Sequence, residues 1–119
     1  MKSMLIIDGS TIVAWLFAEI FERRGWNVVV CNDRASAFEH LGEDAHYDAI
    51  LVSNCVPGTN GLQLIGLIRA LEHLRTAAVV MVTGTRDVKE DALASGADAV
   101  LFKPVNPMAL IWTVEKHTS

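Results

Sequence analysis

Residues 4–10, Met-Leu-Ile-Ile-Asp-Gly-Ser, hold the pattern on which the fold of this sequence depends. Four consecutive apolar residues that stop at a turn are typical of a short strand buried on both faces. Apolar residues at helical spacing follow, beginning with Val13 and Phe17, and Ser10 or Thr11 can cap that helix. The stretch therefore predicts a buried strand that leads directly into a helix.

The same unit repeats along the chain. Four further apolar runs predict strands over residues 26–31, 49–53, 77–82 and 99–102. Between and after them, the sequence favours helices near 34–42, over 62–68, near 88–94 and from Pro107 onward. Alternating strands and helices predict an α/β fold, with a doubly wound parallel sheet covered by helices on both faces. No linker or repeat divides the chain, so we expect a single domain over residues 1–119.

Composition excludes several classes of protein. Half of the 119 residues are hydrophobic, the formal net charge is −4, and no basic cluster exceeds Arg23-Arg24, which argues against nucleic-acid binding. The apolar runs are too short to cross a membrane, for which about 20 residues are needed. Met1-Lys2-Ser3 does not resemble a signal peptide, and Cys31 and Cys55 make neither a disulfide framework nor a metal site. We therefore expect a cytoplasmic protein with reduced thiols.

Polar residues stand where the expected strands end. Asp8, Ser53, Thr83 and Lys103 each follow or close an apolar run. In open parallel sheets, ligands and chemistry collect beyond the carboxyl ends of the strands. These four residues are therefore the candidate functional site.

Short motifs around these residues occur in a fixed order over the whole chain. They are Leu-Ile-Ile-Asp-Gly-Ser (5–10), Leu-Val-Ser-Asn-Cys-Val-Pro-Gly (51–58), Gly-Leu (61–62), Val-Thr-Gly (82–84), Gly-Ala-Asp (96–98) and Lys-Pro (103–104). Together they resemble the receiver domain of bacterial response regulators. The resemblance implies the flavodoxin-like (βα)5 fold with strand order 2-1-3-4-5. It also implies a chemistry, the transfer of a phosphoryl group onto an aspartate beside a bound Mg²⁺ ion.

The sequence departs from the family at the positions that carry this chemistry. The resemblance implies two acids after the first strand, but only Asp8 is present and Gly9 replaces the second. Ser53 stands at the acceptor position and Val100 at that of the switch aromatic, whereas Thr83 and Lys103 are kept. We therefore expect a pseudo-receiver without enzymatic activity, metal or cofactor, which signals through protein contacts that do not depend on phosphorylation.

Two alternatives remain open at this stage. Ser53 could accept a phosphoryl group if Asp8 served as its base, or the pocket could bind a small anion or another ligand. We expect the Lys103 ammonium to lie near Asp8 or the Ser53 hydroxyl, because a buried ammonium without a partner is costly. Because no phosphate needs its charge, replacing Lys103 by Met is expected to be tolerated.

Apolar residues exceed what the core requires on the first and last helices. Ile12 and Trp15 lie beside the core stripe of the first helix, and Ile111 and Trp112 beside that of the last. In the flavodoxin-like order these helices share one face of the sheet, so the four residues could form one patch. We expect a protein partner there, either a second copy in a homodimer, a different signalling protein or a fused output domain.

Overall fold

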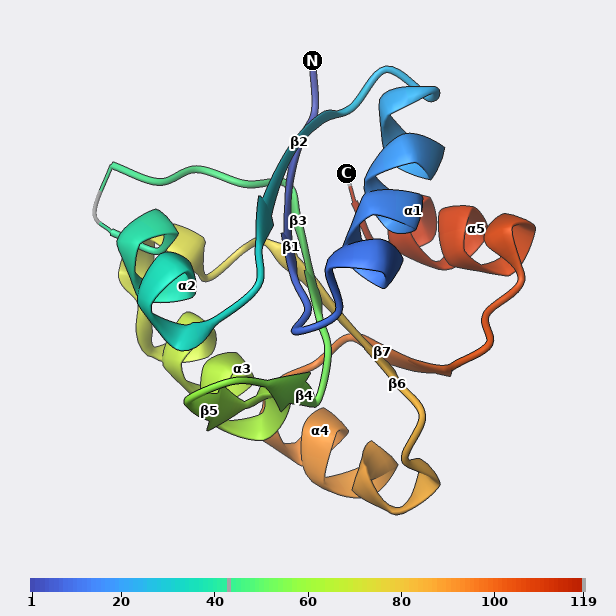
Figure 1. Ribbon diagram of the computed structural model, residues 1–119. Coiled ribbons are helices and arrows are strands. Elements are labelled where there is room, and N and C mark those ends of the chain that lie inside the picture. Colours follow the sequence, from blue (N-terminus) through green and yellow to red (C-terminus); the bar gives the residue numbers. More distant parts are fainter. Residues whose placement is uncertain (43, 119) are drawn as a thin grey trace.

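The computed structural model of the protein describes residues 1–42 and 44–118, and confirms the expected α/β architecture (Figure 1). Five parallel strands form one sheet in the order β2-β1-β3-β6-β7, which is the predicted order 2-1-3-4-5 when the sheet strands are counted along the chain. The elements in chain order are β1 (Ser3–Ile7), α1 (Thr11–Glu22), β2 (Asn27–Cys31), α2 (Arg34–His40), β3 (Ala49–Val52), β4 (Cys55–Val56), β5 (Thr59–Asn60), α3 (Gly61–Ala70), the short 3-10 helix η1 (Glu72–Leu74), β6 (Ala78–Thr83), the 3-10 helix η2 (Arg86–Val88), α4 (Lys89–Ser95), β7 (Ala99–Phe102) and α5 (Pro107–His117).

The sheet separates two hydrophobic clusters, one on each face. On one face, α1 and α5 pack through side chains that include Phe17, Phe21, Leu110 and Val114. On the other face, α2, α3 and α4 cover a second cluster. Strands β1, β3 and β6 contribute to both clusters through alternate residues, so each is buried on its two faces. The predicted placement of the first and last helices on one face is confirmed (Figure 1).

Capping residues fix where the two helices of this face begin. The Ser10 Oγ accepts a hydrogen bond from the backbone N–H of Val13 at 3.2 Å, which makes Ser10 the cap of α1. Asn106 caps α5 by accepting from Met108 and Ala109, and Pro107 takes the first helical position. These caps set the polar ends of both helices beside the carboxyl edge of the sheet.

Several boundaries differ from those expected. Strand β6 ends on Thr83 rather than before it, the helix expected near 34–42 ends at His40, and a 3-10 turn precedes α4. The loop after β3 contains a two-stranded antiparallel hairpin, β4–β5, which the sequence did not predict. Within the described part of the chain, no helix combines the length and the apolar character needed to span a membrane.

Candidate functional site

The four candidate residues meet at the carboxyl edge of the sheet. Asp8, Ser53 and Lys103 directly follow β1, β3 and β7, and Thr83 closes β6. Asp8 and Ser53 are each 3% exposed, and Thr83 is 2% exposed. A cavity of about 550 Å³ opens beside them and is lined by Asp8, Gly9, Ser10, Cys55, Val56, Pro57, Thr59 and Lys103.

Lys103 forms hydrogen bonds with two of the other three candidate residues. Its Nζ donates to Asp8 Oδ2 at 2.9 Å and to the Ser53 hydroxyl oxygen at 3.4 Å. The expectation that the Lys103 ammonium lies near Asp8 or the Ser53 hydroxyl is therefore confirmed. The other Asp8 oxygen, Oδ1, accepts from the backbone N–H of Ser10 at 2.9 Å. Both oxygens of the single carboxylate in the lining are thus engaged by the protein itself.

The two buried hydroxyl oxygens accept hydrogen bonds from local backbone groups. Ser53 Oγ accepts from the N–H of Cys55 at 3.2 Å, and Thr83 Oγ1 accepts from the N–H of Thr85 at 3.1 Å. No histidine is among the lining residues, and the one carboxylate there is held by Lys103. Ser53 consequently lacks the free general base that a hydroxyl nucleophile requires.

Gly9 determines whether a divalent cation fits here. A Cβ atom at this position would lie 2.7 Å from the Cys55 carbonyl oxygen and 2.8 Å from Pro57 Cδ. The Gly9 N–H also donates to that carbonyl at 3.1 Å, so the β4–β5 hairpin sits directly on Gly9. An acidic side chain at position 9 would therefore have no room unless the β4–β5 hairpin moved. With one carboxylate, already paired, the residues present do not fit a Mg²⁺ ion.

Val100 and the two thiols take no part in the hydrogen bonds described for this site. Val100 is half-buried, pairs with Met81 in the sheet and packs against the core. Both cysteines are free. Burial raises the pKa of the Cys31 thiol, which lies 3.4 Å from His40 Nδ1, whereas Cys55 is exposed at the cavity. The sequence missed the Cys55 carbonyl because a backbone contact between distant loops leaves no mark in composition.

The candidate partner surface is largely exposed, as predicted. Ile12, Trp15 and Trp112 are 71%, 61% and 63% exposed. Ile111 differs, because it is half-buried and packs against the core cluster of its face. The four residues therefore do not form one flat patch, since Ile111 belongs partly to the interior.

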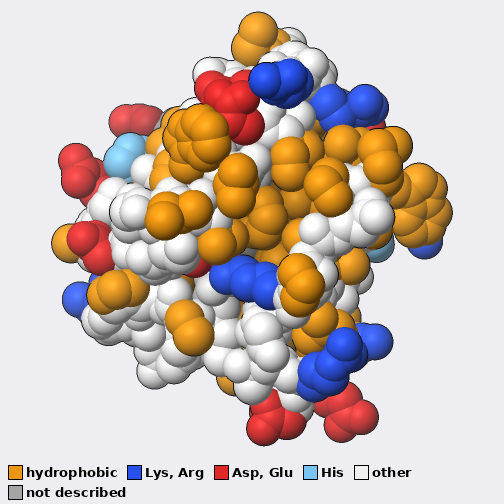
Figure 2. Space-filling model, turned by 45° about the vertical axis from the view of Figure 1, so that its right-hand side comes forward, with side chains coloured by type: hydrophobic (Ala, Val, Ile, Leu, Met, Phe, Trp, Pro, Cys, Tyr) orange, Lys and Arg blue, Asp and Glu red, His pale blue; other side chains and the backbone are white. Residues whose placement is uncertain are grey.

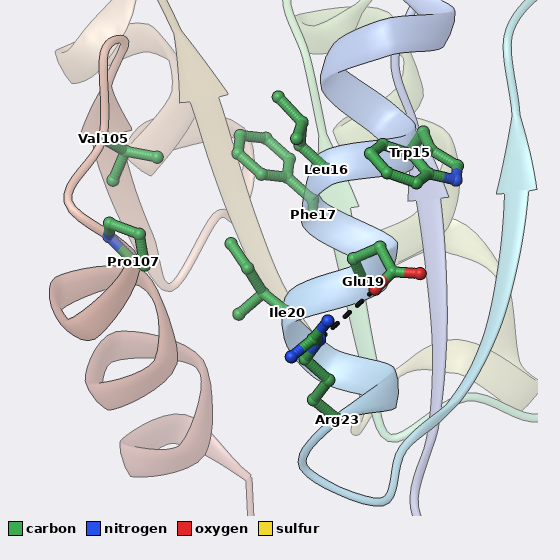
Figure 3. Close-up of a pocket in the computed structure, with 8 residues that line it drawn as sticks. All are labelled: Trp15, Leu16, Phe17, Glu19, Ile20, Arg23, Val105 and Pro107. Carbon is green, nitrogen blue, oxygen red and sulfur yellow. Dashed lines mark hydrogen bonds and ion pairs between the residues drawn. The ribbon is translucent and has the colours of Figure 1, made fainter.

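A groove separates α1 from the β7–α5 loop. Two adjoining hollows of about 420 and 430 Å³ share Leu16, Phe17 and Val105, and together they follow α1 along its length. Figure 3 shows Phe17 and Ile20 extending from α1 toward Val105 and Pro107. Nothing in the sequence indicated the wall that the β7–α5 loop forms. We call this feature the α1 groove, lined by Val13, Trp15, Leu16, Phe17, Glu19, Ile20, Arg23, Lys103, Pro104, Val105 and Pro107.

Fold and site together define a doubly wound α/β domain with a polar pocket where the strands end. The family model of the response regulator receiver domain matches residues 4–115 of this chain. The chain therefore belongs to the receiver domains of two-component response regulators.

Relatives of known name support this membership. The chain is 30% identical over 112 residues to the phosphate regulon transcriptional regulatory protein PhoB of Klebsiella pneumoniae, a match covering 92% of the chain and 48% of PhoB. It is 31% identical over 113 residues to the transcriptional regulatory protein CpxR of Escherichia coli K12, covering 93% of the chain and 47% of CpxR. The chain thus spans about half the length of the regulators it matches.

Solved structures agree with the fold. A CheY-like receiver domain protein from Methanospirillum hungatei superposes with a TM-score of 0.89 at 25% identity, covering 98% of this chain and 92% of the other. A response regulator from Burkholderia pseudomallei, solved with a phosphorylated aspartic acid, a calcium ion and citrate, gives 0.85 at 27% identity, covering 96% and 66%.

Proposed function

We propose that this receiver domain signals without being phosphorylated, as a non-enzymatic module that binds another protein. The ion pair between Lys103 and Asp8 is the observation that carries the proposal. In the receiver chemistry that the resemblance implies, a lysine and acids after the first strand are reserved for phosphate and metal. Here the Nζ and the carboxylate bond each other at 2.9 Å and leave neither group free.

Three further observations support the same conclusion. Ser53 stands at the acceptor position without a free base, Gly9 lies against the Cys55 carbonyl oxygen, and Val100 offers no aromatic ring to reorient. No contact of the pocket favours an anion over this internal pairing. We therefore keep phosphorylation of Ser53 and anion binding as outcomes of the test rather than as second proposals.

The partner is a protein that meets the exposed apolar side chains of α1 and α5. Such surfaces, with large aromatic residues projecting from them, suit protein interfaces better than the surface of an isolated domain. Because the matched regulators are about twice as long as this chain, an output domain fused to it in a longer protein is one source of such a partner. The cytoplasmic location and the absence of nucleic-acid binding, both expected from the sequence, remain parts of this proposal.

Phosphorylation is tested by intact-mass measurement after incubation with acetyl phosphate and Mg²⁺. We expect the mass of the chain to stay unchanged, while a receiver that has its acceptor aspartate, treated in parallel, gains one phosphoryl group. A gain of one phosphoryl group on this chain, mapped to Ser53, would refute the proposal and establish the alternative chemistry.

A further inference from the structure

Helix α4 has little buried surface of its own. It buries one residue, Ala92, whereas α1 buries four residues and α5 buries three. No side chain caps its first turn, and the 3-10 helix η2 that precedes it buries none of its residues. Short helices depend mainly on packing and on caps for their stability. Contacts from outside the helix therefore matter more for the position of α4 than for that of α1 or α5.

An aromatic ring lies at the end of the strand that follows α4. Phe102 is the last residue of β7, is half-buried, and pairs in register with Thr83 at the end of β6. Because side chains alternate along a strand, Phe102 points to the same face of the sheet as Val100, which packs against the cluster covered by α2, α3 and α4. Phe102 thus lies on the face of the switch position, two residues closer to the carboxyl edge.

The guanidinium of Arg86 lies over this ring. Its Cζ is 4.6 Å from the centroid of the Phe102 ring, within the range of a cation–π contact. A similar contact between Arg34 and Phe38, at 4.4 Å, stays within α2. The contact of Arg86 differs because it joins two elements, the 3-10 helix η2 and the strand β7.

Arg86 contacts the ring although carboxylates lie close to it along the chain. Asp87 is in η2, and Glu90 and Asp91 are in the first turn of α4. Figure 2 shows charged side chains of both signs at the lower end of the molecule, where Figure 1 places α4. Among the ion pairs of the described residues, none includes Arg86. A guanidinium is planar and weakly hydrated, which favours stacking on an aromatic face.

The turn that carries Arg86 is also held at the pocket. Thr83 Oγ1 accepts from the N–H of Thr85 at 3.1 Å, and the Lys103 N–H donates to the Thr83 carbonyl at 2.8 Å. Phe102 directly precedes Lys103 in the chain. The contact between Arg86 and Phe102 therefore completes a ring of contacts that begins and ends at pocket residues.

We propose, building on the independence from phosphorylation proposed above, that Arg86 and Phe102 form a latch that holds α4 in one position against the sheet. The latch takes the place of the switch aromatic, which this chain lacks at Val100. Its ring is held under a guanidinium, so the position of α4 does not depend on a phosphate in the pocket. When the contact is broken, η2 and α4 lose their link to β7 and open locally.

The first test measures hydrogen exchange of individual backbone amides in the full chain by NMR. Arg86→Gln and Phe102→Leu should each make the amides of α4 exchange at least about twofold faster, the lower limit for an exposed cation–π contact, and leave those of α2 unchanged. Arg34→Gln is the matched control, because it removes the same kind of contact from within α2. It should speed exchange in α2 and leave α4 unchanged.

A double-mutant cycle tests whether the two side chains of the latch act on each other. The double variant Arg86→Gln with Phe102→Leu should loosen α4 no more than the larger of the two single changes. Far-UV circular dichroism checks that each variant is folded. Exchange in α4 that is indifferent to Arg86→Gln, exchange that rises equally in α2 and α4, or two losses that add in the double variant would overturn the proposal.

The same samples, examined by intact mass after acetyl phosphate treatment, report the phosphorylation state separately. A phosphorylated chain whose α4 still loosens in Arg86→Gln would contradict the proposed function and leave the latch standing. An unmodified chain whose α4 does not respond to Arg86→Gln would do the reverse.

Discussion

At the scale of single residues, Asp8 is the group whose environment constrains the pocket most. Its carboxylate is almost fully buried and has one cation beside it, Lys103. Removing one partner of a buried ion pair leaves the other charge without compensation, which costs more free energy than the intact pair contributes. This burial changes the expectation from the sequence that Lys103→Met is tolerated.

We now expect Lys103→Met to lower the free energy of unfolding by about 3 kcal/mol, the lower end for a broken buried pair, because Lys103 keeps some solvent contact. The double variant Lys103→Met with Asp8→Asn should recover most of this loss, since the amide oxygen of the introduced asparagine can still accept from the Ser10 N–H. Urea unfolding of the three proteins measures the differences. If the single variant is as stable as the wild type, Asp8 does not depend on Lys103.

Gly9 gives a second prediction. Gly9→Ala should lower the free energy of unfolding by about 1–3 kcal/mol, because its Cβ would meet the Cys55 carbonyl oxygen and the Pro57 ring. Gly66→Ala is the matched control, because Gly66 lies in α3 with no atom near its Cβ position. That change should stabilise the protein by about 0.5–1 kcal/mol. Equal effects of the two substitutions would mean that the hairpin does not press on Gly9.

The sequence could predict the location of residues that follow strands, but not contacts that depend on how distant segments pack. Asp8, Ser53 and Lys103 follow apolar runs, and parallel strands bring their carboxyl ends to one edge, so the pocket could be located from the sequence. The contact between Gly9 and Cys55 could not, because it depends on how a hairpin far along the chain packs against the first turn. The half-burial of Ile111 likewise depends on the rotation of α5 against the sheet.

At the scale of elements, an ion pair joins the end of α5 to the turn after α1. Arg24 Nε donates to Glu115 Oε2 at 2.9 Å, its Nη2 donates to Oε1 at 2.6 Å, and the Trp26 indole N–H donates to Oε2 at 3.3 Å. The hydrogen bond from Arg24 is the main cause that lowers the pKa of Glu115. The Glu115 carboxylate thus stabilises the folded state more when it is ionised than when it is protonated.

This arrangement predicts a pH dependence with a definite sign. A pKa lowered in the folded state means stabilisation at neutral pH that is lost as the pH falls below the ordinary glutamate value of about 4.3. The melting temperature of Glu115→Gln should therefore lie below that of the wild type at pH 7, and the gap should narrow in acid. The effect is moderate, because the pair is partly exposed and screened by salt. A gap that persists unchanged in acid would show that charge plays no part.

The sequence predicts elements better when they are long and apolar. All five strands of the sheet were expected, because each is built on a short run of consecutive apolar residues bounded by polar or turn residues. The β4–β5 hairpin was not, since each of its strands has only two residues and neither alternates clearly between apolar and polar. Gly61, which directly follows the hairpin, lies so close to the Ser53 carbonyl and Met81 that a Cβ atom would clash.

At the scale of the whole molecule, the strand-end cavity and the α1 groove share one lining residue. Lys103 lines both the strand-end cavity and the α1 groove. Its ammonium bonds Asp8, while other parts of the residue face the groove beside Pro104. Because the same residue takes part in both, loss of the ion pair between Lys103 and Asp8 should disturb the cavity and the groove together.

Binding of any ligand to the native state raises the stability of the whole domain, so thermal unfolding reports on the pocket without a functional assay. We expect the wild type to have the same melting temperature in millimolar Mg²⁺ as in KCl of equal ionic strength. The reason is that Lys103 and Ser10 already hold the one carboxylate of the pocket. Ser53→Asp adds a second carboxylate to the same pocket, so Mg²⁺ should raise its melting temperature relative to KCl and show that the assay detects binding. A saturating rise in the wild type that disappears in Asp8→Asn would place a cation in the pocket, and the proposed independence from receiver chemistry would then be wrong.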